Sequence, residues 1–131
     1  MTPQVTMTEI TNEPFKVYDF DIEPISLPHG HVTTTAFRFG NFAYATDFKK
    51  FSPEQIDHWR DKVDVMVASG VRFAEHHAHS TVMETVKLMQ DLNVKKGIIT
   101  HLNHEVNYVE HKKLLPNHID FAFDGMELDV N

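Results

Sequence analysis

Residues 63 to 104 read VDVMVASGVRFAEHHAHSTVMETVKLMQDLNVKKGIITHLNH, and they alternate between apolar runs and polar loops. The run 63–68 is short, apolar and rich in β-branched residues, which is typical of a buried strand. Thr81 and Glu84 form a capping box that predicts the start of a helix, and the apolar residues after it recur at helical spacing. The run 97–100 predicts a second short strand. This strand–helix–strand order predicts an α/β fold.

Five of the ten histidines lie in the two loops that follow these predicted strands. His76, His77 and His79 precede the helix, and His101 and His104 follow the second strand. The carboxyl ends of parallel strands lie at the same edge of a sheet. In α/β folds the binding and catalytic residues are concentrated in the loops at this edge. Imidazole is the commonest protein metal ligand and titrates nearest neutral pH. The pattern therefore predicts a metal site or an acid–base site at that edge.

Another helix is predicted on the N-terminal side of this stretch. Ser52 suits the N-cap, Pro53 suits the first helical position, and Gln55 completes a capping box. We expect this helix to end near residue 61. Two of its apolar side chains are expected to be buried, those of Ile56 and Trp59.

Short extended runs predict strands elsewhere, at 5–10, 15–20, 22–27, 33–39, 42–46, 119–123 and 126–130. Gly40-Asn41 and Asp124-Gly125 are two-residue turn signals, so each predicts a hairpin. A third helix is expected over 105–115, because Pro116 would end it. The chain is thus expected to form a mixed sheet with helices on one face.

Size and composition limit the classes of protein that the chain can represent. Its 131 residues are enough for one modest domain. It has no cysteine, which excludes disulfides and thiolate metal sites and fits a reducing cytoplasm. The net charge of -7 argues against generic binding to nucleic-acid backbones. No apolar run is long enough to cross a bilayer, and the N-terminus lacks a signal-peptide pattern, so we expect a cytoplasmic protein without a membrane partner.

Two candidate site residues directly follow predicted strands. Asp47 ends an apolar run and could bind or bridge a metal ion, although an aspartate in this position more often caps a turn. His101 directly follows the apolar run 97–100 in the same way. Its alternative role is that of a surface histidine. Together they place a carboxylate and an imidazole at one edge of the predicted sheet.

Other histidines are candidates because of the elements beside them. His79 lies just ahead of a helix, where it could donate a proton or hydrogen-bond an oxyanion. His104 is expected at the start of the third helix, whose free N–H groups suit an anion. Either His29 or His31 could be a metal ligand, since Gly30 between them allows close backbone approach. His76 and His77 have no distinguishing spacing and are expected to lie beside the site or in solvent.

Several of these motifs resemble, in order, those of the metallo-β-lactamase-fold hydrolases. The resemblance covers nearly all of residues 22 to 131, and this part of the chain resembles the second half of the fold. The phosphoribosyl cyclic phosphodiesterases are the most similar branch, and tRNase Z is a more distant relative. The matching segments are Leu27-Pro28-His29-Gly30 with Ala36-Phe37-Arg38-Phe39-Gly40, Phe42-Ala43-Tyr44-Ala45-Thr46-Asp47, His79-Ser80-Thr81, Thr100-His101-Leu102-Asn103-His104, and Leu115-Pro116 through Phe123-Asp124-Gly125-Met126-Glu127.

This resemblance implies a role for each matching residue. His29, Asp47 and His101 are implied as metal ligands, with Asp47 bridging two ions. His79 is implied as the residue that contacts the scissile phosphate and acts as general acid. We expect His104 to contact the phosphate as well. Ligands without sulfur suit two divalent ions, zinc or manganese.

The family's His-x-His-x-Asp-His signature is absent from residues 1 to 131. Three ligands for two ions leave an incomplete site. We therefore expect the chain to be the C-terminal half of an αββα sandwich, a single partial domain in which residues 1–21 supply strands that close the missing first half. This half is expected to be a weak phosphodiesterase or an inactive one.

The alternative is a half-domain without catalysis that binds a metal or ligand and pairs with a partner chain or with itself. A lone half would expose an apolar sheet face, which favours a homodimer or association with the missing N-terminal half. A third alternative is a structural histidine-rich domain with accidental motif matches. As substrate we expect a small-molecule phosphodiester, and a nucleic acid is the less expected alternative because of the net charge of -7.

Overall fold

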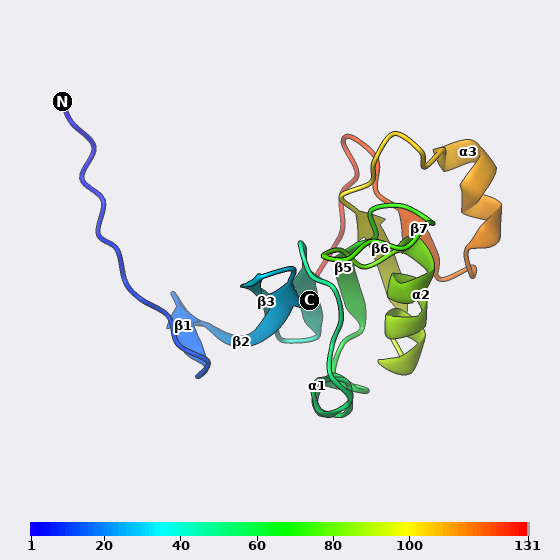
Figure 1. The fold of residues 1–131 in the computed structure, drawn as a ribbon. Coiled ribbons are helices and arrows are strands. Elements are labelled where there is room, and N and C mark those ends of the chain that lie inside the picture. Colours follow the sequence, from blue (N-terminus) through cyan, green and yellow to red (C-terminus); the bar gives the residue numbers. More distant parts are fainter. Residues whose placement is uncertain (131) are drawn as a thin grey trace.

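A single seven-stranded sheet organises the chain (Figure 1). The computed structural model describes residues 1–130. Its elements, in chain order, are β1 (Phe15–Val17), β2 (Phe20–His29), β3 (Val32–Phe39), β4 (Phe42–Ala45), α1 (Pro53–Trp59), β5 (Val65–Ser69), α2 (Val82–Asp91), β6 (Lys96–Thr100), α3 (Tyr108–His111), the 3-10 turn η1 (Lys112–Leu114) and β7 (Ile119–Phe121). No helix among these residues is long and apolar enough to span a bilayer.

The sheet is mixed, as expected. Strands β1 to β4 pair in antiparallel order, whereas β4, β5, β6 and β7 pair in parallel. Because β3 reverses the chain between β2 and β4, the strands β2, β4, β5, β6 and β7 all run in one direction. Their carboxyl ends therefore meet at a single edge of the sheet.

Local signals in the sequence explain the first strands. The predicted hairpin at Gly40-Asn41 is confirmed, since Phe39 pairs with Phe42 and Gly40 has a φ of +57°. Strand β2 tolerates two prolines because β1 pairs only with its first three residues. From Glu23 onward β2 is an edge strand, where a missing N–H breaks no ladder.

Both capping boxes are confirmed, and the helices cover one face of the sheet. Ser52 caps α1 with Gln55, and Thr81 caps α2 with Glu84. In Figure 1, α2 lies across β5 and β6. The inward-facing residues of the strands pack with both helices in one core, in which the largest fully buried side chains include Trp59, Phe48, Phe121, Leu27, Met66, Met89 and Leu92.

The opposite face of the sheet is also apolar. Seven side chains from β1 to β4 line a shallow hollow of about 480 Å³ there: Phe15, Val17, Ile22, Phe37, Phe39, Phe42 and Tyr44. We call this surface the outer face. None of its lining residues is charged, and Val17 and Tyr44 are exposed. Strands that are apolar on both sides are typical of sheets covered on both faces.

Four predicted elements differ in the structure. The run 15–20 is not one strand, because the chain turns at Tyr18 and divides it into β1 and the start of β2. Residues 5–10 form no strand, because nothing pairs with them, and the segment projects from the domain (Figure 1). Residues 126–130 form no strand either. The turn at Gly125 exists, but the Asp120 side chain accepts the outward Phe121 N–H that a hairpin partner would need. The third helix begins at Tyr108, since Asn103 closes a separate turn and Asn107 is the N-cap.

Glu23 joins β2 to β3 and α1. Its carboxylate accepts hydrogen bonds from the Trp59 indole at 2.5 Å and from Arg38 at 3.3 Å, and lies 3.0 Å from His58 Nε2. Burial alone would raise the pKa of Glu23, but the Trp59 hydrogen bond and the Arg38 charge outweigh it and hold the pKa below its ordinary value. The ionised form of Glu23 therefore stabilises the fold.

Replacing Glu23 by alanine should lower the free energy of unfolding by about 1–3 kcal/mol at pH 7, since the buried indole N–H loses its partner. The difference from wild type should shrink as the pH falls through the lowered pKa, because the wild-type carboxylate then becomes protonated. Urea unfolding at several pH values measures both effects. Glu9→Ala in the projecting segment is the control and should change little. Equal stability of Glu23→Ala and wild type at pH 7 would contradict this role.

Candidate metal centre

Three side chains from separate parts of the chain converge at the carboxyl edge of the sheet. His29 ends β2, Asp47 lies in the loop after β4, and His79 lies in the loop before α2. Each can offer one ligand atom such that all three atoms lie within 4.8 Å of one another. The three residues are half-buried. Two imidazoles and a carboxylate in this arrangement are typical metal-binding groups.

His101 joins this group from the end of β6. Its Nε2 lies 3.2 Å from Asp47 Oδ1. Asp47 and His101 both adopt the left-handed region, with φ of +56° and +60°. Few non-glycine residues do so, and such conformations gather at functional sites. Asp47 therefore lies near both His29 and His101, two residues that the sequence singled out.

Backbone hydrogen bonds hold the loops of the site against one another. Lys49 N donates to Pro28 O at 2.8 Å, and Ser80 N donates to Phe48 O at 2.7 Å. The loop after β6 is joined as well, since Gly70 N donates to Thr100 O at 3.1 Å. The segments that carry His29, Asp47, His79 and His101 are therefore fixed relative to one another by main-chain contacts.

A buried hydroxyl pair anchors the loop that carries His79. Thr85 Oγ1 donates to Ser69 O at 2.6 Å and lies 2.8 Å from Ser80 Oγ. All three residues are buried. This network ties the end of β5, the loop before α2 and α2 itself together.

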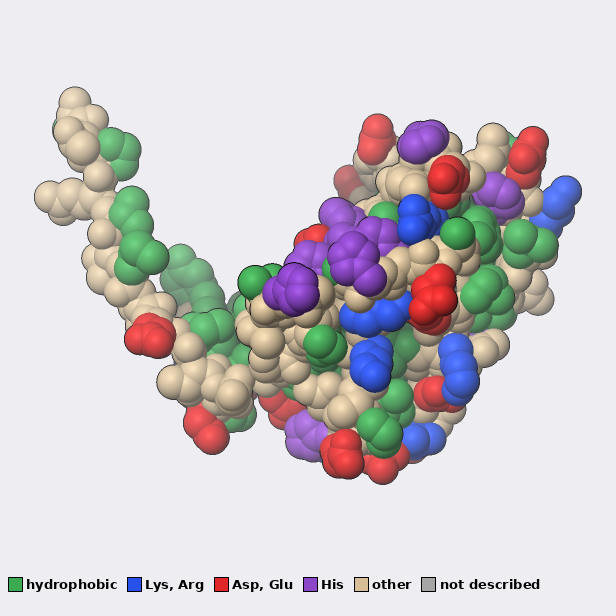
Figure 2. All heavy atoms as spheres, viewed as in Figure 1, with side chains coloured by type: hydrophobic (Ala, Val, Ile, Leu, Met, Phe, Trp, Pro, Cys, Tyr) green, Lys and Arg blue, Asp and Glu red, His purple; other side chains and the backbone are tan. Residues whose placement is uncertain are grey.

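The imidazole rings form a connected group on the surface, and Figure 2 shows histidines gathered on the upper part of the domain. The ring of His79 lies at its centre. Its centroid is 4.6 Å from that of His29, 4.8 Å from that of His76 and 5.2 Å from that of His101. His77 stacks on His76 at 4.8 Å but is exposed.

His76 has a structural role that sequence reasoning missed. Its Nδ1 accepts hydrogen bonds from the N–H groups of Ala78 and His79, at 3.1 and 3.2 Å. The carbonyl of Ala78 in turn accepts from His29 Nδ1 at 3.1 Å, which leaves His29 Nε2 free for a ligand. A side chain that accepts from residues two and three positions ahead is usual for Asp and Asn, so a histidine in this position gave no signal.

The environment of His79 favours its neutral form. Burial is the largest cause of its lowered pKa, and the positive charges that His29, His76 and His101 would carry add to it. The Asp47 carboxylate acts in the opposite direction. A neutral imidazole has a free lone pair, which metal binding requires.

The residues of this site fit a divalent ion. His79 Nδ1 is buried and has no hydrogen-bond partner among the described residues. A buried polar atom without a partner is costly, and a cation held with Asp47 and His29 would supply one. Nitrogen and oxygen donors without sulfur suit zinc or manganese.

His104 lies outside this group. It is exposed, and no ring contact within residues 1–130 joins it to the other histidines. We expected His104 at the start of the third helix, and this placement is wrong because α3 begins at Tyr108. Its contact with a phosphate stays a prediction. His31 is exposed in the turn after β2, so the structure favours His29 over His31 as the ligand.

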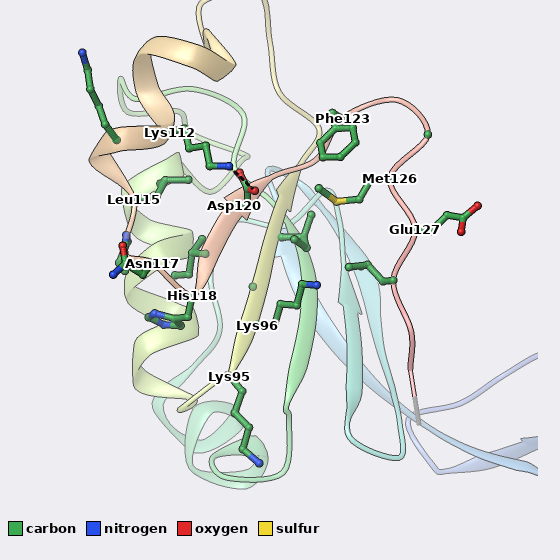
Figure 3. Close-up of a pocket in the computed structure, with 17 residues that line it drawn as sticks. Lys95, Lys96, Lys112, Leu115, Asn117, His118, Asp120, Phe123, Met126 and Glu127 are labelled. Atoms are coloured by element: carbon green, nitrogen blue, oxygen red, sulfur yellow. Dashed lines mark ion pairs between the residues drawn. The ribbon is translucent and has the colours of Figure 1, made fainter.

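A hollow of about 790 Å³ lies away from the histidine group and beside β7 (Figure 3). Lys112 pairs with Asp120 there at 3.1 Å, and Phe123 and Met126 line its other side. None of the converging histidines lines it. The candidate metal ligands therefore lie at the open edge of the sheet and do not line this hollow.

Residues 2–102 match the family model of the Beta-lactamase superfamily domain. A solved structure described as a new diphosphatase from the PhnP family is 28% identical, with a TM-score of 0.92 over 98% of this chain and 50% of that one. Human tRNase Z, short form, shares the fold at 14% identity, with a TM-score of 0.69 over 89% of this chain and 46% of that one.

A curated relative is the octanoyltransferase of Porphyromonas gingivalis (strain ATCC BAA-308 / W83), 28% identical over 99% of this chain. This chain aligns with only 27% of that protein. It also spans about half the length of the solved structures that it matches. The activities of those whole proteins are therefore not assigned directly to this chain.

The pKa of His79 provides a test of the site geometry without any metal. Asp47→Asn should lower the pKa of His79 further, because it removes the one nearby negative charge that opposes the shift. His101→Ala should move it towards the ordinary value. NMR titration of the imidazole protons measures both, with His118→Ala as a remote control. A pKa of His79 that is the same in wild type and Asp47→Asn would show that the two side chains do not meet.

Proposed function

The chain belongs to the beta-lactamase superfamily, and on this basis we propose that residues 1–131 supply one half of a metal-dependent phosphodiesterase site. The observation that carries the proposal is the convergence of His29, Asp47 and His101 at one edge of the sheet. Asp47 approaches imidazoles from two different strand ends, which suits a carboxylate shared by two ions.

Three side chains are the metal ligands in this proposal. His29 Nε2, Asp47 and His101 would hold two divalent ions, zinc or manganese. Ala78 O accepts a hydrogen bond from His29 Nδ1 and so orients the ring. When bound, such ions activate a water and neutralise phosphate charge. Asp47 and His101 both have left-handed backbone conformations just beyond the ends of β4 and β6.

His79 contacts the phosphate in this proposal, together with His104. Near neutral pH, the lowered pKa leaves His79 with one N–H that donates a hydrogen bond to a phosphate oxygen. The negative charge of a bound phosphate raises the pKa of an imidazole beside it. His79 can thereby take up a proton once substrate is present and donate it to the leaving group.

The remaining metal ligands come from polypeptide outside residues 1–131. The His-x-His-x-Asp-His signature does not occur in this sequence, and the diphosphatase relative is about twice as long as its match to this chain. By itself this half is therefore a weak catalyst or an inactive one. A small-molecule phosphodiester suits a protein of net charge -7 better than a nucleic acid does. The lack of cysteine suits a reducing compartment such as the cytoplasm.

A second candidate function is that of a pairing half-domain without catalysis. The outer face favours it, because its seven apolar side chains are the kind that a second sheet covers. Either a missing half or a second copy of this chain would bury that face. This function and the first differ in whether the completed assembly hydrolyses a phosphodiester.

The catalytic proposal is tested with bis-p-nitrophenyl phosphate and added zinc or manganese. The chain alone should show little turnover. Adding in trans the half of the PhnP-family diphosphatase that this chain does not cover should raise the rate, and Asp47→Asn should abolish that gain. Lys16→Ala, an exposed position on β1, is the control and should behave as wild type.

Robust turnover by the chain alone would contradict the need for outside ligands. A rise in rate that Asp47→Asn leaves intact would contradict the role of this site. Binding of the two halves without turnover at any metal concentration would favour the pairing half-domain.

The outer face predicts the association state of the purified chain. Sedimentation velocity should show dimers or larger species, and the double variant Phe39→Asp/Phe42→Asp should sediment as a monomer because charged side chains resist burial. Val109→Asp changes an exposed apolar residue elsewhere and should leave association unchanged. A wild-type chain that remains monomeric at high concentration would contradict self-pairing through this face.

A further inference from the structure

We infer that Lys49 is a positioning residue, which holds the loop that carries Asp47 against the loop that carries His79. The inference rests on the proposed function, in which these two loops form one site, and it adds a residue that binds neither an ion nor the substrate. Lys49 lies two positions after Asp47. Its side chain is only 22% exposed, although lysine is mostly found in solvent.

The side chain of Lys49 reaches the second loop directly. Its Nζ donates to His79 O at 3.4 Å and to the two carboxylate oxygens of Glu84 at 3.3 and 3.2 Å. Glu84 belongs to α2, and its carboxylate also accepts from Thr81 N at 3.0 Å as part of the capping box. Lys49 therefore bonds both to the main chain of His79 and to the first turn of the helix that follows it.

The main chain of Lys49 bonds to a third segment of the site. Its N–H donates to Pro28 O at 2.8 Å, and Pro28 directly precedes His29. One residue thus contacts the segments that carry His29 and His79, and it belongs to the loop that carries Asp47. A shift of Lys49 would therefore change the distances among all three of these side chains.

The main chain of His79 is held from two sides. Its N–H donates to His76 Nδ1 at 3.2 Å, and its carbonyl oxygen accepts from Lys49 Nζ. Hydrogen bonds of this kind orient the groups that bind an ion or a substrate. Loss of the Lys49 ammonium would leave the carbonyl oxygen of His79 without this donor, so the loop could turn the imidazole away from His29.

The hydrogen-bond donors of Lys49 are fully used in these contacts. A lysine ammonium has three N–H donors and no acceptor, and three oxygen atoms accept from Nζ. The Glu84 carboxylate also balances the charge of the ammonium. Lys49 is therefore suited to holding the two loops together and not to binding a phosphate, and it acts on the site through His79.

The first test compares variants of the full chain by NMR without metal. The rings of His29 and His79 have centroids 4.6 Å apart, so their imidazole protons should show a nuclear Overhauser signal. Lys49→Met should weaken this signal because the loops separate. Lys49→Arg keeps a charged donor and should retain most of it. Lys50→Met is the matched control, since Lys50 is exposed and has no ion pair within residues 1–130.

The second test is a calorimetric titration of the same variants with zinc chloride, which separates position from charge. Removal of a positive charge near a cation would by itself tighten zinc binding, whereas loss of position weakens it. We expect about 10-fold weaker binding for Lys49→Met, at the low end of the effect of outer partners of metal ligands. Lys49→Arg and Lys50→Met should bind zinc nearly as wild type.

Zinc binding that is unchanged or tighter in Lys49→Met would overturn the inference, as would an unchanged signal between His29 and His79. Unfolding of Lys49→Met, seen in the resonances of the buried Trp59, would also overturn it, because Lys49 would then stabilise the whole fold. If the wild-type chain binds no zinc, the proposed function loses its support, and the NMR comparison alone decides the role of Lys49. The inference and the proposed function can therefore fail separately.

Discussion

The candidate site depends on main-chain hydrogen bonds that join the loops at one edge of the sheet. Lys49 N bonds to Pro28 O, Ser80 N to Phe48 O and Gly70 N to Thr100 O. Each bond links segments far apart in the sequence, so it fixes side chains that local structure could not bring together. The strands determine which loops meet, because all strands except β1 and β3 run towards this edge. The histidines of these loops converge because of that geometry.

Much of this architecture can be predicted from the sequence because its signals are local. A capping box uses residues three positions apart, and both boxes form as expected. The turn at Gly40-Asn41 needs only a residue that tolerates positive φ. Asp47 and His101 could be placed at the same edge because each directly follows an apolar strand, and the structure brings them within 3.2 Å. The mixed sheet with helices on one face is confirmed.

Other features depend on contacts that no local pattern encodes. Residues 126–130 alternate like a strand, but the side chain of Asp120 occupies the edge that they would pair with. His76 was expected to be a bystander, yet it accepts two backbone N–H groups that shape the loop carrying His79. The distance from His79 to Asp47 depends on the register of β4 and on the position of α2, which only the assembled fold supplies.

The central claim is that the carboxyl edge of this sheet is a metal centre built around Asp47. Anomalous diffraction from a crystal of the chain soaked with zinc tests it most directly, because the signal locates the ion without assumptions about ligands. The account predicts a peak within bonding distance of Asp47 and His29. Zinc found only at other histidines, such as His111 or His118, with none at this edge, would contradict it.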